Sequence, residues 1–373
     1  MKKSLKVWLL LLVLVTGLLP LTAFAQESSR EKLNFNQGWK FVRGNIQEAI
    51  QVDYPMEELE RWESVDLPHT VREEPYNNSG GINYQGEAMY RKHFSLPKEY
   101  EGKKLYMEFE GVMGVTDVWV NGEHLQGKMA AKTGENTQYG GYLPFILDVT
   151  DAVHCDGEYN VVTVLTDNSD NETVPPGKPQ SQLDFTYFGG IYRNVWLEVT
   201  DPVHITDPVF EDMVAGGGIL VEYPQVSKES ATVSVKTHVR NEGDAQQEVT
   251  LRTELADADG KIVQTRSDSY TLDGEGDHTF AQELTVSNPN LWNLDRPYLY
   301  KLISTVLVDG KALDCQETKI GIRKITMNKD TGLLINGEHT GFLSGVNRHQ
   351  EYPYVGYAAS SNMQRRDAIK FKE

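Results

Sequence analysis

Apolar and polar residues alternate with a period of two, in short runs, through the first half of the chain. Lys104–Glu110 and Val115–Val120 both follow this pattern, and the second run ends in Asn121-Gly122, a dipeptide typical of tight hairpins. Two further runs of this kind are Tyr159–Leu165 and Tyr192–Val199. Helical periodicity is nearly absent, apart from Pro55–Trp62. Many short strands without intervening helices predict an antiparallel sandwich, which we assign to residues 28–200 as a jelly-roll.

A second set of strand patterns begins after a boundary at Pro202 and runs to about Arg323. Its clearest runs are Ala231–Val239, Glu248–Leu255 and Tyr298–Leu307, with polar turns between them. The length and spacing predict an immunoglobulin-like sandwich over residues 203–323, without the paired cysteines of antibody domains.

Residues 324–373 have a different pattern. Gly341–His349 reads as a strand, and the polar run Asn362–Lys370 that follows it reads as a helix. A strand followed by a helix predicts the first βα unit of a (β/α)8 TIM barrel, which needs about 250 residues when complete. We therefore expect a truncated barrel. Residues 332–373 would bury no core of their own, and the strand would have two open edges.

The N-terminus carries the pattern of a secretion signal. Three lysines among the first six residues precede an apolar run, Val7–Val15, and Ala23-Phe24-Ala25 supplies the small residues of a cleavage site. The run is short for a membrane span, which needs about 20 residues. We predict a signal peptide over residues 1–25, cleaved after Ala25, and export to the periplasm or the extracellular space. An uncleaved signal anchor is the alternative.

The charge balance limits the partners of the chain. Its 36 basic and 54 acidic residues give a formal net charge of −18, which becomes −21 when the three signal lysines leave. This excess would repel nucleic acid and anionic membranes, but it is compatible with a neutral sugar. Cys155 and Cys315 lie in different predicted domains and are interpreted as isolated buried thiols. The nine histidines show no metal-ligand spacing, so we predict no metal site.

A series of motifs, in order and at domain-scale spacing, gives the chain a specific resemblance. The motifs are Asp66–Thr70, Tyr90–Phe94, Val118–Gly122, Gly140–Phe145, Asp184–Arg193, Asn290–Trp292, Pro297–Tyr300, Ile320–Arg323 and Gly345–Gln350. Together they resemble the N-terminal portion of family 2 glycoside hydrolases, the group that contains β-galactosidases, β-glucuronidases and β-mannosidases. The resemblance covers essentially the whole mature sequence. It implies an enzyme that hydrolyses terminal β-linked sugars with retention of configuration.

The last motif favours one branch of that family. Asn347–Gly356 is similar to the β-galactosidase form, whereas β-glucuronidases tend to carry Lys-His-Glu-Asp there and β-mannosidases an Asn-Trp form. The resemblance therefore implies a β-galactosidase, with a β-glucuronidase-type enzyme as the alternative. A stand-alone carbohydrate-binding or assembly protein that kept only the β domains is the alternative from another class.

The resemblance also implies roles for particular residues. The two catalytic glutamates of the family lie on later barrel strands. Glu351 and Glu373 do not match them, so we predict that the chain on its own is inactive. His349 would hydrogen-bond a sugar hydroxyl at the end of the first barrel strand, with Asn347 as a further substrate contact and Arg348 as support. Asp184, on a loop of the first sandwich, would bind sugar hydroxyls through its carboxylate.

Other features near these motifs have simpler interpretations. We assign most of a group of aromatic residues to the core, namely Tyr139, Tyr142, Phe145, Phe185, Tyr187 and Phe188. The acidic residues Glu57, Glu58, Glu60, Glu73 and Glu74 are interpreted as solvated surface. We predict no cofactor within this chain. Family members often use Mg²⁺ or Na⁺ near the acid/base, with ligands mostly beyond Glu373, and the full-length form could be a homo-oligomer.

Overall fold

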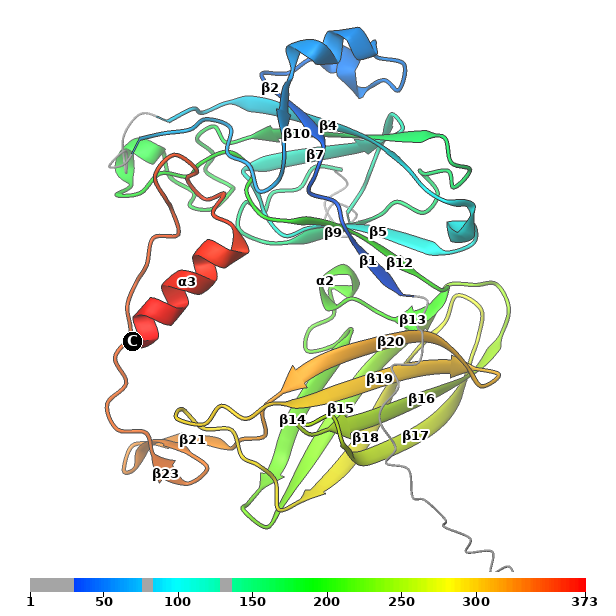
Figure 1. Ribbon diagram of the computed structural model, residues 1–373, viewed down its shortest axis with the longest axis vertical. Coiled ribbons are helices and arrows are strands. Elements are labelled where there is room, and N and C mark those ends of the chain that lie inside the picture. Colours follow the sequence, from blue (N-terminus) through cyan, green and yellow to red (C-terminus); the bar gives the residue numbers. More distant parts are fainter. Residues whose placement is uncertain (1–29, 76–82, 128–135) are drawn as a thin grey trace, which may run out of the picture.

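The protein is mainly β, as predicted. A computed structural model describes residues 30–75, 83–127 and 136–373. Two layered β units lie one above the other, and the C-terminal segment runs along one side of both (Figure 1). In the described part of the chain, no helix is long and apolar enough to cross a bilayer. The predicted signal peptide lies outside the described residues.

The first unit, which we call the first sandwich, contains a six-stranded and a four-stranded sheet with a short third ladder. The six-stranded sheet has the order β3-β2-β4-β10-β7-β8, the four-stranded sheet β1-β12-β5-β9, and the short ladder β11-β6. The strands are β1 (Glu31–Asn34), β2 (Trp39–Arg43), β3 (Glu63–Val65), β4 (Glu87–Ser95), β5 (Lys104–Phe109), β6 (Val112–Met113), β7 (Val115–Val120), β8 (Glu123–His124), β9 (Phe145–Asp148), β10 (Tyr159–Asp167), β11 (Gly190–Ile191) and β12 (Val195–Thr200). Their pairing is antiparallel throughout.

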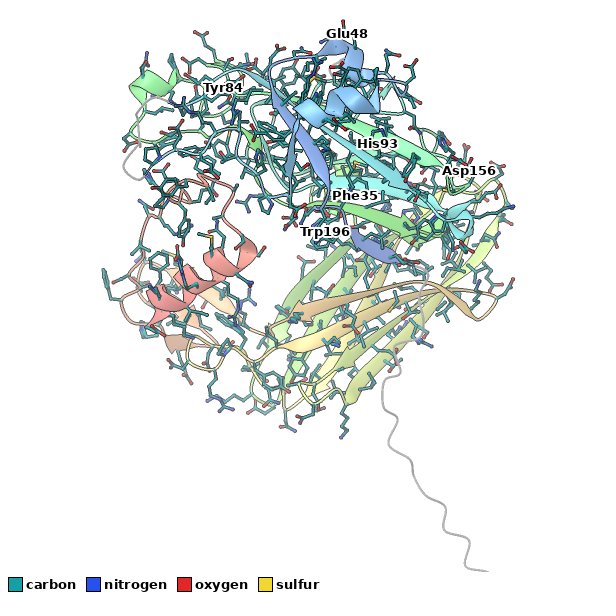
Figure 2. All side chains as sticks on the ribbon, turned by 45° about the horizontal axis from the view of Figure 1, so that its top comes forward. Phe35, Glu48, Tyr84, His93, Asp156 and Trp196 are labelled. Carbon is teal, nitrogen blue, oxygen red and sulfur yellow. The ribbon has the colours of Figure 1, made fainter. Side chains whose placement is uncertain are left out.

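The predicted strands of this unit follow from their alternation. β7 buries Thr116, Val118 and Val120 and turns the residues between them outward. It continues through Asn121-Gly122, both at positive φ, into β8, which confirms the predicted hairpin. Phe35 and Trp196, labelled in Figure 2, lie near the lower edge of this unit, where Phe35 packs edge-to-face on Phe94 at 5.0 Å.

Short 3-10 helices connect several strands of the first sandwich. They are η1 (Gln47–Ile50), η2 (Met56–Arg61), η3 (Lys98–Tyr100) and η4 (Gln180–Gln182). The helical pattern expected at Pro55–Trp62 is thus about two turns of a tighter helix, which starts after Pro55 and ends before Trp62, whose side chain is buried.

The second unit, which we call the second sandwich, has longer and more regular strands. One sheet has the order β13-β15-β14, with β18 also pairing β15, and the other has the order β17-β16-β19-β20. The elements are β13 (Val203–Ile205), α2 (Pro208–Glu211), β14 (Ile219–Val226), β15 (Ser230–Asn241), β16 (Gln247–Ala256), β17 (Ile262–Leu272), β18 (Asp277–Ser287), β19 (Tyr300–Val308) and β20 (Lys311–Ile320). The jelly-roll and immunoglobulin-like assignments of the two units remain predictions.

A buried ion cluster joins the two sandwiches. Asp314 on β20 is fully buried and accepts hydrogen bonds from Arg30 Nε at 2.8 Å and from the Ile205 amide at 2.7 Å. Arg30 precedes β1 and also binds Glu198 of β12 at 3.1 Å. The guanidinium therefore holds one carboxylate from each sandwich, and the contact ties β1 to β13 and β20 (Figure 1).

The C-terminal segment contains a small ladder and one helix. The ladder is β21 (Ile325–Asn328), β22 (Gly332–Ile335) and β23 (Glu338–His339), and the helix is α3 (Ser361–Lys372). The Ser360 hydroxyl caps α3 by accepting a hydrogen bond from the Met363 amide. This agrees with the helix predicted at Asn362–Lys370.

The strand predicted at Gly341–His349 is wrong. In the described part of the chain, these residues join no ladder and make no backbone–backbone hydrogen bond. A strand is stabilised by a neighbour that pairs with its backbone and covers its apolar face. No described strand pairs with residues 341–349, and the side chains of Phe342 and Val346 are 95% and 70% exposed. The start of a barrel at residues 324–373 remains a prediction.

Candidate functional site

The ten residues from Gln350 to Ala359, which we call the strap, fold back onto the first sandwich. Tyr354 and Glu74 form an antiparallel bridge, in which the Tyr354 amide donates to the Glu74 carbonyl at 2.7 Å and the Glu74 amide donates back at 3.3 Å. Arg193 Nη2 donates to Gln350 Oε1 at 3.1 Å. The expectation that residues 332–373 would bury no core is therefore wrong in part, because the strap uses the core of its neighbour.

The strap ends in an aromatic pocket of the first sandwich, which we call the socket. The socket consists of Met113, Tyr187, Phe188 and Tyr192, all of them buried, with Tyr142 at its margin. Tyr357 inserts there and is 6% exposed. Its ring centroid lies 5.6 Å from that of Phe188 and 5.7 Å from that of Tyr192, both edge-to-face. Burial raises the pKa of the Tyr357 and Tyr192 hydroxyls, so both remain protonated.

His349 lies one residue before the strap and next to the loop that carries Asp184. Its ring centroid is 6.0 Å from that of Phe185, edge-to-face. Its Nδ1 lies 3.7 Å from Glu351 Oε1, and half of its side chain is exposed. Asp184 adjoins Phe185 in sequence and is exposed. The structure thus brings together two segments that are 165 residues apart and that carry two of the predicted sugar contacts, His349 and Asp184.

Asn347 and Arg348, the other two predicted site residues, differ in their contacts. Asn347 is exposed, and within the described residues its side chain makes no hydrogen bond or ion pair. Arg348 instead turns to α3, where Nε and Nη2 bind Asp367 Oδ2 at 2.8 and 2.7 Å and Nη1 binds Gln364 at 2.8 Å. Its partial burial alone would lower the pKa of Arg348, but the contacts with Tyr352 and Asp367 raise it. Arg348 therefore ties the residue before His349 to α3 rather than facing a ligand.

A polar cluster that the sequence analysis missed braces the Asp184 loop. Asp170 accepts hydrogen bonds from the Tyr187 hydroxyl, from Gln85 Nε2 at 2.7 Å and from the Gln180 amide at 2.9 Å. The hydrogen bond from Tyr187, together with those from Gln180 and Gln85, lowers the pKa of Asp170. Gln180 is buried, and its Oε1 accepts from the Tyr187 amide at 3.3 Å. In the sequence these residues are ordinary polar loop residues, so no pattern could have identified them.

Two interpretations of side chains near the site need correction. Glu74 is buried, at 5% exposed, and pairs with Arg72 Nε at 3.1 Å, because the strap covers it. Among the six aromatic residues assigned mostly to the core, Tyr187 and Phe188 are buried, whereas Tyr142, Phe145 and Phe185 are half-buried and Tyr139 is exposed. Tyr142 contacts Tyr357 of the strap and Phe185 contacts His349, whereas Phe145 stacks on Phe109 within the first sandwich.

The described residues offer no metal centre. No group of three or more His, Cys, Asp or Glu side chains converges in residues 30–75, 83–127 and 136–373. Cys155 and Cys315 are both free, as expected, but half-buried rather than buried.

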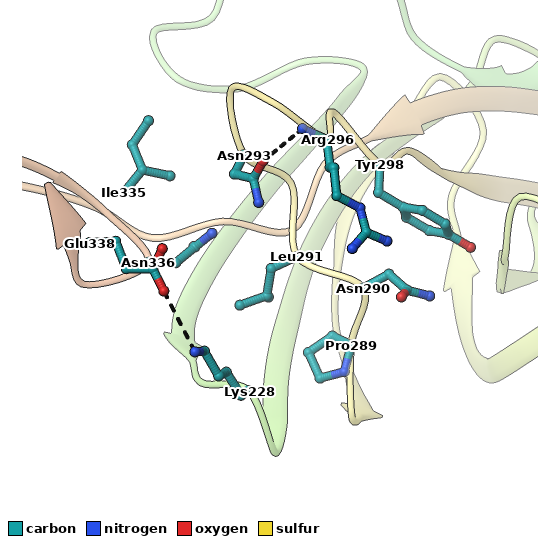
Figure 3. A pocket seen from close by; sticks show the side chains of 10 residues that line it. All are labelled: Lys228, Pro289, Asn290, Leu291, Asn293, Arg296, Tyr298, Ile335, Asn336 and Glu338. Carbon is teal, nitrogen blue, oxygen red and sulfur yellow. Dashed lines mark hydrogen bonds and ion pairs between the residues drawn. The ribbon is translucent and has the colours of Figure 1, made fainter. Parts of the chain in front are cut away.

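A cleft of about 240 Å³ lies where the second sandwich meets the β21–β23 ladder (Figure 3). The side-chain amides of two asparagines that line the cleft bind the backbone of nearby loops. Asn293 Oδ1 accepts from the Arg296 amide at 2.7 Å, and Asn336 Nδ2 donates to the Trp292 carbonyl at 2.9 Å. Lys228 and Glu338 pair across its edge at 3.6 Å. Neither Asp184 nor His349 lines this cleft, which we interpret as a joint between two elements.

Comparison with known proteins gives consistent matches along the described chain. Residues 23–202 match the family model "Glycosyl hydrolases family 2, sugar binding domain", and residues 219–323 match "Glycosyl hydrolases family 2". The chain is 33% identical to a β-galactosidase of Thermoanaerobacter pseudethanolicus over 91% of its own length and 41% of that protein. It is 32% identical to a β-glucuronidase of Formosa agariphila over 85% of its own length and 32% of that protein.

Solved structures show the same likeness. A β-glucuronidase of Bacteroides uniformis superimposes with a TM-score of 0.79 and 26% identity, covering 92% of this chain and 38% of that one. The chain thus spans roughly a third to two fifths of the length of these relatives.

Proposed function

Because the chain belongs to glycosyl hydrolase family 2, we propose that it supplies the sugar-binding sandwich, a second sandwich and one edge of the substrate site of an exported, retaining glycosidase. The enzyme would hydrolyse terminal β-linked sugars. The observation that carries this proposal is the edge-to-face contact of Phe185 with His349, which brings the Asp184 loop and the strap to one place. Neither segment is near the other in sequence, so the fold alone creates this meeting point.

The chemistry of the two residues suits a sugar. A carboxylate such as Asp184 can accept hydrogen bonds from two neighbouring hydroxyl groups, and an exposed imidazole such as His349 can donate one or accept one. Phe185 follows Asp184 in the sequence and contacts His349, and its half-buried ring offers an apolar surface to the C–H face of a pyranose. We assign Asp184 to ground-state binding and His349 to a contact that strengthens in the transition state.

The catalytic step itself is assigned to residues that this chain does not carry. Retaining hydrolysis needs two carboxyl groups about 5–5.5 Å apart, one as acid/base and one as nucleophile. Glu351 pairs with His349, and Glu74 is buried under the strap and paired with Arg72. Neither is placed to serve as half of such a pair, so we expect the isolated chain to be inactive.

The charges around the site favour a galactoside over a glucuronide. A glucuronide carries a carboxylate that calls for a cation, as arginine typically provides. The three arginines that contact the strap or its neighbours are engaged: Arg72 with Glu74, Arg193 with Gln350, and Arg348 with Asp367. Asp184 would repel the ligand carboxylate. A β-glucuronidase is the second candidate, favoured by the relatives that carry that name.

The substrate assignment can be tested with the chain of residues 26–373, from which the predicted signal peptide has been removed. We expect methyl β-galactoside to shift the NMR signals of His349 and of residues 184–186 at millimolar concentration, and methyl β-glucuronide to shift them less. Asp184→Asn keeps the shape of the side chain and removes the charge, so it should weaken the galactoside response and reduce the discrimination against the glucuronide. A stronger response to the glucuronide would replace the galactosidase proposal with the second candidate. No response to either sugar would favour a binding or assembly protein of another kind.

A catalytically complete form of the protein allows a second test. His349→Ala should lower kcat more than it raises KM, whereas Asp184→Ala should act mainly on KM. The chain of residues 26–373 should not hydrolyse aryl β-galactosides. Turnover by that chain that disappears in Glu351→Ala would show that Glu351 is catalytic and that our assignment is wrong.

A further inference from the structure

His349 is linked to the first sandwich through the residues that follow it, whereas Arg348, directly before it, binds Asp367 and Gln364 of α3, the helix that follows the strap. On its N-terminal side, residues 341–347 are all exposed and make no backbone–backbone hydrogen bond within the described chain. On its C-terminal side, the strap is fixed at Gln350, at Tyr354 and at Tyr357. Apart from the contact of His349 with Phe185, the contacts that join this part of the chain to the first sandwich therefore come from the strap.

Of the three residues that fix the strap, Tyr357 is the most deeply buried. Its ring is enclosed by the socket, with edge-to-face contacts to Phe188 and Tyr192 and a tilted contact to Tyr142 at 6.2 Å. Ala358 and Ala359 are also buried beside it. The remainder of the strap is tightened by a reciprocal backbone pair between Tyr352 and Gly356, at 3.0 and 2.9 Å. The eight residues from His349 to Gly356 are thus held as one folded loop.

Gly356 allows the strap backbone to pack directly against the socket, where Tyr357 inserts. Its φ is +53°, in the left-handed region that a side chain disfavours. A Cβ built there would lie 2.5 Å from Cγ of Phe188, well inside contact distance, with two further ring atoms within 2.9 Å. Phe188 is itself buried in the socket. No side chain fits between the strap backbone and this ring without displacing one of them.

We propose that Gly356 and Tyr357 are positioning residues for the sugar site: by seating the strap in the socket, they hold His349 against Phe185 and beside Asp184. This inference rests on the proposed function for its purpose, but its geometry stands by itself. It makes the first sandwich, and not residues 341–347, the part of the protein that places the sugar-contacting histidine. It also explains why a loop residue with few contacts of its own can have a fixed place.

The test uses the chain of residues 26–373 and two matched pairs of variants. Gly356→Ala should unseat the strap, whereas Gly345→Ala serves as its control, because a Cβ at Gly345 meets no atom within 4 Å and its φ is not positive. Tyr357→Ala should empty the socket, whereas Tyr357→Phe keeps the ring and should restore the parental behaviour. Hydrogen exchange in β15 and β16 of the second sandwich reports whether each variant is folded.

Two readouts separate positioning from general stability. Amide exchange over residues 352–358 should rise more than about tenfold in Gly356→Ala and Tyr357→Ala, and stay within about twofold of the parent in the two controls. The His349 ring signal, identified by its loss in His349→Gln, should move toward the position of an unstructured histidine in the same two variants, because it loses the ring current of Phe185.

The outcomes are distinct. A His349 signal that stays at its parental position while strap exchange rises would overturn the positioning role, as would equal effects of Gly345→Ala and Gly356→Ala. If the signal moves as expected but methyl β-galactoside shifts no resonance even in the parent, the proposed function fails and the positioning role stands. If the sugar response is present in the parent and in Tyr357→Phe and absent in Tyr357→Ala, both hold.

Discussion

The two sandwiches use β structure in different ways. In the second, four strands have 10 or 11 residues and β15 has 12, and its core is built largely from valine and leucine. In the first, no strand exceeds nine residues and several have only two to four, and its core includes Trp39, Phe41 and Tyr90. Large rings fill irregular space between short strands, whereas small branched side chains suit long flat ladders.

This difference explains where the candidate site lies. Many residues of the first sandwich lie in the connections between its strands. One connection, residues 168–189, carries Asp184 and Phe185 and is held by hydrogen bonds to Asp170. The socket and the half-buried ring of Tyr142 bind the strap, which comes from the C-terminal part of the chain. The second sandwich joins most of its long strands by short turns, and its cleft with the β21–β23 ladder is its contact with the C-terminal segment. Binding residues commonly lie on irregular loops that a rigid scaffold holds in place. The first sandwich offers such loops, whereas the regular strands of the second do not.

The largest effect that would sharpen the comparison concerns the contact between the two sandwiches. Asp314→Ala removes a fully buried carboxylate that binds Arg30 and the Ile205 amide, and it leaves a cation without its main partner. We expect a loss of about 3–5 kcal/mol in the free energy of unfolding. Urea unfolding followed separately by Trp fluorescence and by exchange in β16 should then show two transitions in place of one.

Asp314→Asn is the control for this change, because it keeps an oxygen acceptor for the Ile205 amide and should cost less than Asp314→Ala. A loss below about 1 kcal/mol in Asp314→Ala would mean that burial of these charges is offset by their desolvation. The two sandwiches would then be independent units joined by a loose contact.

A smaller effect, confined to the first sandwich, should appear at mildly acidic pH. Burial, with a contribution from the Arg43 cation, lowers the pKa of His69 to about 4. Its Nδ1 lies 2.8 Å from the Tyr90 hydroxyl, within hydrogen-bond distance, so the neutral ring has a partner in the folded chain. The unfolded chain binds this proton below about pH 6.5 and the folded chain does not until about pH 4. The stabilisation is therefore complete above pH 6.5 and is lost as the pH falls.

We expect His69 to account for roughly 2 kcal/mol of lost stability between pH 7 and pH 5. The measurement is the difference between parent and His69→Gln in urea unfolding at both pH values, which cancels the other titrating groups. His69→Gln should be less sensitive to acid than the parent. Identical slopes in the two proteins would show that His69 is protonated without penalty in the folded state.

The smallest effect should come from the joint of the second sandwich. Lys228 and Glu338 pair at 3.6 Å, but about three quarters of each side chain is exposed. Exposed pairs are screened by solvent, so Lys228→Ala should change the free energy of unfolding by less than about 0.5 kcal/mol. Thermal unfolding at low and at 1 M salt should give the same difference. A loss above 1 kcal/mol would mean that the cleft in Figure 3 is a structural clamp.

The local pattern of the sequence was enough for much of the fold. Val115–Val120, the Asn121-Gly122 hairpin and the helix near Asn362–Lys370 follow from alternation, positive φ and capping, which act within a few residues. Family membership could also be predicted, because ordered motifs survive in the sequence. Such signals report what each segment prefers by itself.

Only the tertiary structure decided the rest. The segment Gly341–His349 has the composition of a strand but no described neighbour to pair with, and Glu74 reads as solvated surface but lies beneath Tyr354, 280 residues away. The socket for Tyr357 and the bracing of the Asp184 loop by Asp170 also join distant segments. Burial and hydrogen bonding are properties of pairs, and a sequence pattern describes only one member of each pair.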